Sequence, residues 1–496
     1  MVEKLSLKTK FAYGVAAIGD AGSYTILGTF LMFFLTTVAG INPVTAGTIA
    51  AMGSVWDAVC SPIIGYISDN RQSKYGRRIP FMFFAAFPLG VSCSMLFASI
   101  DASYALKVLY YGVLVIVFWT AFSAFFIPYM AMGAEITNDY DERTSLRSTT
   151  YGFNIVGMVI GMVMPTLIVD FLLNREVSLS HAWHGAGMIV GAMAALSILY
   201  TCFILGRKKQ TPTPFREQLR EKGQRKTEEK KPRGMKWENM IKEYLEVLKL
   251  NPILCLIGAS ISYLVANAMN SADRMYFMTY NLNFKAETIT VVMLFCILSG
   301  MIFIPIVIRI SKMLDKRLVL IYSLAVGIIG SVVANVTGIH TVFGMCVFLL
   351  VYTCANSAYW QLMPAMIYDV CEVDELIYGR RREGAVISLQ SLSEAIASAM
   401  GMQLLGIVLE CAGFNGAAVT QSDSAMLWVR YALTLIPALF MVISMIMVVK
   451  YPITKARFHE VMMALEKKKN GEEVDLEEMK FLYGGKYARK RKSNDL

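Results

Sequence analysis

Asp57 is an acidic residue in the middle of an otherwise apolar stretch, SVWDAVCSPIIGYISD, which spans residues 54–69. If this stretch is helical, Ser61 lies one turn later on the same face as Asp57. A carboxylate can bind Na⁺ together with neutral oxygens such as a hydroxyl, and it can also take up a proton. The alternative is a structural carboxylate that is paired with a distant Arg or Lys. Both interpretations of Asp57 follow from residue type and spacing.

A strongly charged segment follows directly, because residues 69–78 hold one acid and four bases around a glycine. A solvated loop that obeys the positive-inside rule of membrane proteins would have this composition. The other interpretation is a switch, in which the bases pair with acids of neighbouring loops in one conformation and release them in another.

The composition of the chain indicates a membrane protein. Of its 496 residues, 56% are hydrophobic and only 17% are charged, whereas a soluble protein carries roughly 25% charged residues. The net charge is +10, but the basic residues occur in short runs between apolar segments, which is typical of membrane loops and does not favour nucleic-acid binding. The nine cysteines occur singly, so neither a disulfide framework nor a zinc site is expected.

Twelve segments are long and apolar enough to cross a bilayer as helices, which need about 20 residues each. They cover residues 11–37, 43–68, 79–100, 104–134, 146–173, 185–206, 250–281, 287–310, 317–338, 341–368, 383–411 and 425–450. Lys and Arg gather on one side of this succession, so we expect both termini to be cytoplasmic and the protein to lie in the cell inner or plasma membrane. The N-terminus lacks a small-residue cleavage site, and no removable signal peptide is expected.

The sixth connection divides the chain in two. Residues 207–249 are long, polar and basic, and we expect them to form a cytoplasmic linker between a six-helix bundle at 1–206 and a second one at 250–450. Residues 451–496 are expected to be a cytoplasmic tail. A weak internal echo supports the duplication: IPYMAMGAEITNDYDER at 127–143 and LMPAMIYDVCEVDELIYGRR at 362–381 both have a Pro, then spaced acids, then Arg.

Several motifs make the sequence resemble a known family. The segment GYISDNRQSKYGRR is similar to the loop between spans two and three of the major facilitator superfamily. In chain order, Gly19–Asp20, WDAVCSPIIGYISD, IPYMAMGAEITNDYDERTSL and PAMIYDVCEVDELIYGRRREG resemble the glycoside–pentoside–hexuronide:cation symporter family, and the match covers all twelve spans. The resemblance implies an all-α integral membrane protein, with twelve transmembrane helices in two six-helix bundles around a central cavity.

For the cation site, the resemblance favours Asp57, which is assisted by Ser61 and Asp20. Na⁺ or H⁺ would be the coupling ion, with no other cofactor. Sodium-coupled relatives commonly have a second aspartate at the position of Ser61, so its absence keeps proton coupling open. The charged segment is then interpreted as a cytoplasmic gate, whose residues are expected to be Asp69, Arg71, Arg77, Arg78, Glu135, Asp139, Asp141, Arg143, Asp369 and Arg381.

The sugar site departs from melibiose-permease-like members, because their charged sugar contacts correspond here to Ala21, Phe126, Tyr151 and Ala395. A galactoside pocket is therefore not reproduced, although Tyr151 suits stacking on a sugar ring or an apolar aglycone. Arg274 suits a carboxylated substrate, or else it neutralises Asp273 or lies in the headgroup layer. The candidate substrate residues are Asp20, Ser23, Tyr24, Tyr151, Asn154, Asn267, Asn270, Arg274, Trp360, Gln390 and Glu394.

The expected function is therefore cation-coupled symport of a sugar, glycoside or hexuronide by alternating access, with the protein acting as a monomer in the lipid bilayer. The alternative is a carrier of an amphiphilic, lysolipid-like substrate, or an uncoupled facilitator on the same fold. An enzyme is not expected, because the chain lacks a phosphate-binding loop and an HExxH motif, and its four histidines are not arranged as a metal site.

Overall fold

The computed structural model describes residues 5–70, 78–136, 140–207, 246–379, 383–416, 418 and 420–469. The first half of this chain consists of α1 (Leu7–Phe33), η1 (Phe34–Val38), α2 (Pro43–Asn70), α3 (Ile79–Leu96), α4 (Tyr104–Ile136), α5 (Tyr140–Leu173) and α6 (Leu179–Arg207). The second half consists of α9 (Asn251–Tyr276), η2 (Phe277–Asn281), α10 (Ala286–Met313), α11 (Lys316–Thr337), α12 (Val342–Tyr378), α13 (Glu383–Cys411), α14 (Asp423–Leu433), α15 (Leu435–Lys450) and α16 (Lys455–Lys469).

The described residues contain twelve helical segments that are long and apolar enough to cross a membrane. This confirms the all-α fold and the number of spans predicted from the sequence. The last span was expected to be one continuous helix, but the structure breaks it at Thr434, between α14 and α15. Asn270 on α9 donates its side-chain N–H to the Leu433 carbonyl at 3.0 Å, and this bond satisfies an acceptor that the break leaves without a helical partner.

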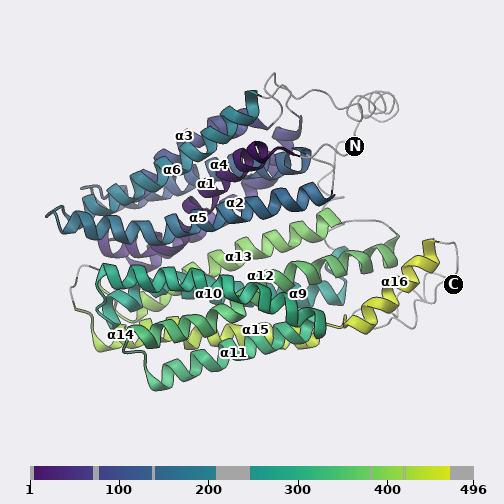
Figure 1. Ribbon diagram of the computed structural model, residues 1–496. Coiled ribbons are helices and arrows are strands. Elements are labelled where there is room, and N and C mark those ends of the chain that lie inside the picture. The colour runs from purple at the N-terminus through teal and green to yellow at the C-terminus, as the bar shows by residue number, and fades with distance from the viewer. Residues whose placement is uncertain are drawn as a thin grey trace.

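The helices form two groups, which Figure 1 shows one above the other: α1–α6 in purple to teal, and α9–α15 in green to yellow. We call these groups the N-terminal half and the C-terminal half. Small residues let helices approach closely, as is usual in membranes, where packing and hydrogen bonds replace the hydrophobic effect between helices. Gly90 on α3 faces Gly191 on α6, and a methyl group at either position would overlap the backbone of the other helix.

Both described chain ends lie at the same end of the bundle, which we call the terminal end. The backbone N–H of Leu5 donates to Glu142 at the start of α5, and Lys10 on α1 forms an ion pair with Glu142 at 2.8 Å. In the other half, Lys468 on α16 donates to the Leu376 carbonyl near the end of α12, at 2.5 Å. The opposite end of the bundle is the far end.

The two halves are held together mainly at the far end. The helix pairs α2 and α13, α5 and α10, and α1 and α9 form the seam between them. A methyl group at Gly406 on α13 would overlap the backbone of Pro43, the first residue of α2. Six hydrogen bonds join described residues of the two halves: Thr36–Tyr276, Thr37–Tyr280, Val44–Glu410, Thr48–Gln403, Thr166–Thr290 and, nearer the middle, Ser54–Ser398. The far end is therefore closed in this conformation.

Candidate cation and substrate site

Asp57 lies on α2 beside α4, where two serine hydroxyls converge on one of its carboxylate oxygens. Ser123 Oγ on α4 donates to Asp57 Oδ1 at 2.5 Å, and Ser61 Oγ donates to the same oxygen at 3.4 Å. Ser61 reaches Asp57 because it lies one helical turn away, whereas Ser123 arrives from a neighbouring helix. The second carboxylate oxygen, Oδ2, accepts no hydrogen bond from the described residues.

Among the described residues, the carboxylate of Asp57 has no cationic partner. Within the part of the chain that the structure describes, no Lys, Arg or His lies within ion-pair distance of it. Asp57 and Ser61 are both partly exposed, while Ser123 is buried. A charge inside a span costs about 2.5–3.5 kcal/mol on insertion scales. The structure therefore does not support the interpretation of Asp57 as half of a buried ion pair, and it leaves the carboxylate accessible to a small cation.

A tryptophan fixes how α2 is oriented on α4. Trp56 Nε1 donates to Thr120 Oγ1 at 2.8 Å, and Thr120 in turn donates to the Ile116 carbonyl at 2.7 Å. Trp56 precedes Asp57, and Thr120 lies one turn from Ser123 on the same helix. This bond therefore aligns the two helices at the level where Ser123 meets Asp57.

Tyr24 on α1 lies near the three acids that were predicted to be functional, Asp20, Asp57 and Glu394. Its phenol lies near Asp20 and Asp57 in its own half and near Glu394 on α13 of the other half. The side chain is 52% exposed although it lies in the middle of a span. Asn154 on α5 donates to Asp20 at 3.5 Å, a long contact. The structure thus brings five predicted residues to the region between the halves: Asp20, Tyr24, Asp57, Asn154 and Glu394.

Aromatic rings line the N-terminal side of this region. Tyr24 packs edge-on against Trp119, with ring centroids 5.9 Å apart, and lies 6.0 Å from Phe122. Phe122 stacks on Phe126, with ring centroids 5.6 Å apart. Tyr151 on α5 is half exposed and has no hydrogen-bonded partner among the described residues. These rings can contact the apolar face of a sugar or an aglycone.

The C-terminal half contributes a connected polar cluster. Gln390 on α13 donates to Glu394 at 3.1 Å and exchanges hydrogen bonds with Ser260 on α9 at 2.9 and 3.1 Å. Tyr359 on α12 also donates to Ser260, at 2.9 Å. Trp360 packs edge-on against Tyr359 and is 48% exposed. Three helices therefore hold Glu394 in place, and the partly exposed Glu394 interacts with Tyr24 across the seam.

Three predicted substrate residues are instead bound within the protein. Ser23 is fully buried and donates to the Gly19 carbonyl of its own helix at 2.6 Å. Asn270 is fully buried and bonded to Leu433, as described above. Arg274 is only 5% exposed; it donates to Asn270 Oδ1 at 2.9 Å and contacts Cys296 Sγ at 3.3 Å. A substrate cannot reach these groups in this conformation, in which Arg274 has internal contacts, and its role as a carboxylate receptor stays a prediction.

Two further expectations for α9 have different outcomes. Asn267 is partly exposed, and its amide has no hydrogen bond to the described residues, so it stays available to a ligand. Asp273 follows Asn270 by one turn, but it forms no ion pair with Arg274. The proposed neutralisation of Asp273 by Arg274 is therefore wrong for this conformation, because the two side chains point to different neighbours.

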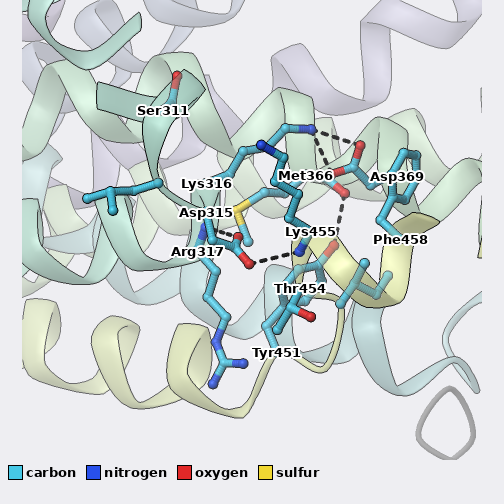
Figure 2. Close-up of a pocket in the computed structure, with 12 residues that line it drawn as sticks. Ser311, Asp315, Lys316, Arg317, Met366, Asp369, Tyr451, Thr454, Lys455 and Phe458 are labelled. Carbon is cyan, nitrogen blue, oxygen red and sulfur yellow. Dashed lines mark hydrogen bonds and ion pairs between the residues drawn. The ribbon is translucent and has the colours of Figure 1, made fainter. Parts of the chain in front are cut away.

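The expected gate residues are described only in part. Lys316 at the start of α11 forms an ion pair with Asp369 on α12 at 2.8 Å, which Figure 2 shows beside the ring of Phe458 on α16. Arg78 is buried and donates to Ser68 at 2.8 Å. Arg71, Arg77, Asp139 and Arg381 lie outside the described residues, as do the side chains of Asp69, Glu135, Asp141 and Arg143.

Sequence reasoning missed the closest partner of Asp57. Ser123 lies in an apolar run, TAFSAFF, and a single serine in a span is usually a helix-packing residue. Only the neighbouring position of α2 and α4 gives it a role. The same holds for Ser260 on α9, which bonds to Gln390 although the two residues are far apart in the sequence.

The model of the family described as MFS/sugar transport protein matches residues 12–455 of the chain. An uncharacterised symporter of Synechocystis sp. is 25% identical over 95% of this chain and 99% of its own length. A putative glycoside/cation symporter of Escherichia coli is 24% identical over 92% of this chain and 94% of its own. Among solved structures, that of a D-xylose–proton symporter superposes with a TM-score of 0.59 at 13% identity, covering 87% of this chain and 96% of that one.

Proposed function

The chain belongs to the MFS/sugar transport protein family, and from this premise we propose that it couples the entry of a sugar or glycoside to the entry of a monovalent cation. It is a multi-pass membrane transporter and not an enzyme. The cation, the substrate and the orientation in the membrane are parts of the proposal. The positive-inside rule supports a cytoplasmic terminal end, which makes the closed far end the extracellular one.

The observation that carries the proposal is the environment of Asp57. Asp57 is a partly exposed carboxylate inside a span, with two hydroxyls at one oxygen and no basic partner among the described residues. The carboxylate and hydroxyl oxygens are the ligands that a small cation needs. Na⁺ would be held by Asp57, Ser123 and Ser61 through their oxygens, whereas H⁺ would bind to the carboxylate itself. In either case, the cation neutralises a charge that is otherwise costly in the membrane.

Coupling requires that the cation and the substrate affect one another, and Tyr24 is placed to transmit this effect. Its phenol lies near Asp57, Asp20 and Glu394, and so between the cation site and the acid of the other half. When a cation neutralises Asp57, the repulsion between these carboxylates falls, and the two halves can approach around a substrate. A monovalent cation that moves inward across 100 mV releases about 2.3 kcal/mol, which supports uphill entry of the substrate.

The proposed substrate is a glycoside with an apolar aglycone. The carboxylates of Asp20 and Glu394 can accept hydrogen bonds from sugar hydroxyls, and the rings of Tyr24 and Trp119 can contact an apolar group. A relative named as a putative glycoside/cation symporter supports this class. An amphiphilic carrier or an uncoupled facilitator remains the competing function, and the following experiment separates them.

We would reconstitute the purified full-length protein in proteoliposomes and measure uptake of radiolabelled alkyl and aryl glycosides, hexuronides and lysolipids under imposed Na⁺, Li⁺ or H⁺ gradients. The proposal predicts that one cation gradient drives a glycoside above its external concentration. Uptake that only equilibrates under every gradient would identify a facilitator. Gradient-driven uptake of lysolipids without glycoside uptake would identify the amphiphilic carrier.

A further inference from the structure

Asp273 on α9 is a second acidic residue inside a span, and it lies in a closed environment. Its side chain is 0% exposed, and neither carboxylate oxygen has a hydrogen-bond partner among the described residues. Among the described residues, neither the adjacent Arg274 nor Arg430 on α14, a helix that packs against α9, forms an ion pair with it. Within the described chain, a complete carboxyl group is therefore buried without any donor or cation.

The position of Asp273 places it at the far-end seam. Tyr276 lies one turn further along α9 and interacts electrostatically with Asp273. The Tyr276 hydroxyl bonds to Thr36 of η1 in the other half at 2.6 Å, and the ring of Phe33 packs edge-on against Tyr276 at 5.3 Å. Asp273 is thus enclosed directly beneath a contact that must break when the far end opens.

Arg274 cannot compensate the neighbouring acid, because consecutive residues on a helix point to different sides. It faces the interior of the C-terminal half, where Asn270 and Cys296 hold its guanidinium. Tyr276, one turn further along α9 itself, is the titratable group that lies near Asp273 among the described residues. Glu410 on α13 is engaged instead with the backbone of Val44.

An ionised carboxylate without a partner costs several kcal/mol to bury, whereas the neutral acid costs much less. We propose that Asp273 is a proton-binding site of the far-end gate: it holds a proton while the gate is closed and releases it when the gate opens to water. Because the proton enters and leaves from the same side, it gates the transporter and is not carried across. This role is separate from that of the cation at Asp57, but it rests on the alternating access proposed above.

The pH dependence follows from linkage. The closed far end binds one proton more than the open far end, so acid outside favours closure and alkali favours opening. The equilibrium between the two forms changes by up to about tenfold per pH unit, the slope for a single proton. Replacement of Asp273 with a residue that cannot ionise removes this dependence and leaves the gate biased toward closure.

The gate can be followed by spin-label distances across the far end. Labels would be placed at Ser103→Cys before α4 and His340→Cys before α12, both exposed residues, in full-length protein in nanodiscs with the exposed Cys411 replaced by serine. Distances would be measured between about pH 5 and about pH 8. Asp273→Asn and Asp273→Leu are the test variants, Asp273→Glu keeps an acid, and Glu287→Gln removes an exposed carboxylate at the same end.

We expect the long-distance population to grow with pH in the parent protein, in Asp273→Glu and in Glu287→Gln. Both Asp273→Asn and Asp273→Leu should show a short distance that pH does not change, while eluting as folded, monodisperse protein. A pH response that survives in either neutral variant overturns the proposal. If the distances respond to cations or glycosides but not to pH, the proton-binding role of Asp273 is wrong, while alternating access still stands. If the distances never change, both the role of Asp273 and the alternating-access cycle are wrong.

Discussion

Asp57 and Asp273 are the same residue type in the same kind of apolar helix, one in each half of the molecule, yet their surroundings differ. Asp57 is partly exposed and accepts two serine hydroxyls, whereas Asp273 is sealed and accepts no hydrogen bond from the described residues. Hydroxyl donors and access suit an exchangeable cation, while a sealed carboxyl without donors suits only a proton. The neighbours of a buried acid, more than its own type, therefore decide which ion it can serve.

The largest effect on stability is expected for Arg274, a charged residue with internal contacts in the C-terminal half. Arg274→Leu leaves the Asn270 oxygen without its donor and removes the contact with Cys296. We expect the free energy of unfolding to fall by about 3 kcal/mol, with a lower thermal denaturation midpoint of the detergent-solubilised protein.

The matched control is Asn267→Leu, since Asn267 lies on the same helix but has no hydrogen bond to the described residues. Its denaturation midpoint should stay close to that of the parent, as should that of Asp57→Asn. If Arg274→Leu is as stable as these two variants, the distinction between a structural charge in one half and a functional charge in the other breaks down.

A smaller effect is expected on the affinity for the coupling cation when either serine hydroxyl at Asp57 is removed. Ser123→Ala removes the donor at 2.5 Å, and Ser61→Ala removes the one at 3.4 Å. We expect Ser123→Ala to weaken the apparent affinity for the coupling cation by about tenfold, the lower end of what is seen for residues that support a metal ligand, and Ser61→Ala to weaken it less. Cation titrations of transport would measure both.

Ser123→Thr keeps the hydroxyl and should restore most of the affinity. Equal losses in Ser123→Ala and Ser61→Ala, or no loss in either, would mean that the hydroxyl geometry at Asp57 does not define the cation site.

The smallest effects concern the ion pairs at the terminal end of each half. Lys10 and Glu142 have side chains that are 10% and 12% exposed, whereas those of Lys316 and Asp369 are 40% and 15% exposed. Double-mutant cycles on thermal stability should give a coupling of about 1 kcal/mol for the first pair and about 0.5 kcal/mol for the second.

Added salt should reduce the coupling of Lys316 with Asp369 more than that of Lys10 with Glu142, because solvent screens exposed charges. The reverse order of couplings would show that burial does not set the strength of these contacts.

The sequence is sufficient to predict the membrane spans, but not the side-chain contacts between helices. Hydropathy located all twelve spans, although the tenth extends to Tyr378 instead of 368 and the sixth begins at Leu179 instead of 185. Thr434 interrupts the last span, because hydropathy does not sense a break that another helix repairs through Asn270.

Hydropathy also identified Asp57 as a functional candidate, because a charged residue in an apolar span has a high free energy of insertion into the membrane. Ser123 and the burial of Arg274 could not be predicted, because both depend on which helices are neighbours in space.

The most direct test of the central claim compares two modes of transport in the same proteoliposomes. Asp57→Asn keeps the shape of the side chain but can neither ionise nor neutralise a cation. The account predicts that this variant exchanges internal for external glycoside at a measurable rate, but no longer accumulates it under a cation gradient that loads the parent protein. Accumulation by Asp57→Asn to the level of the parent would contradict the account.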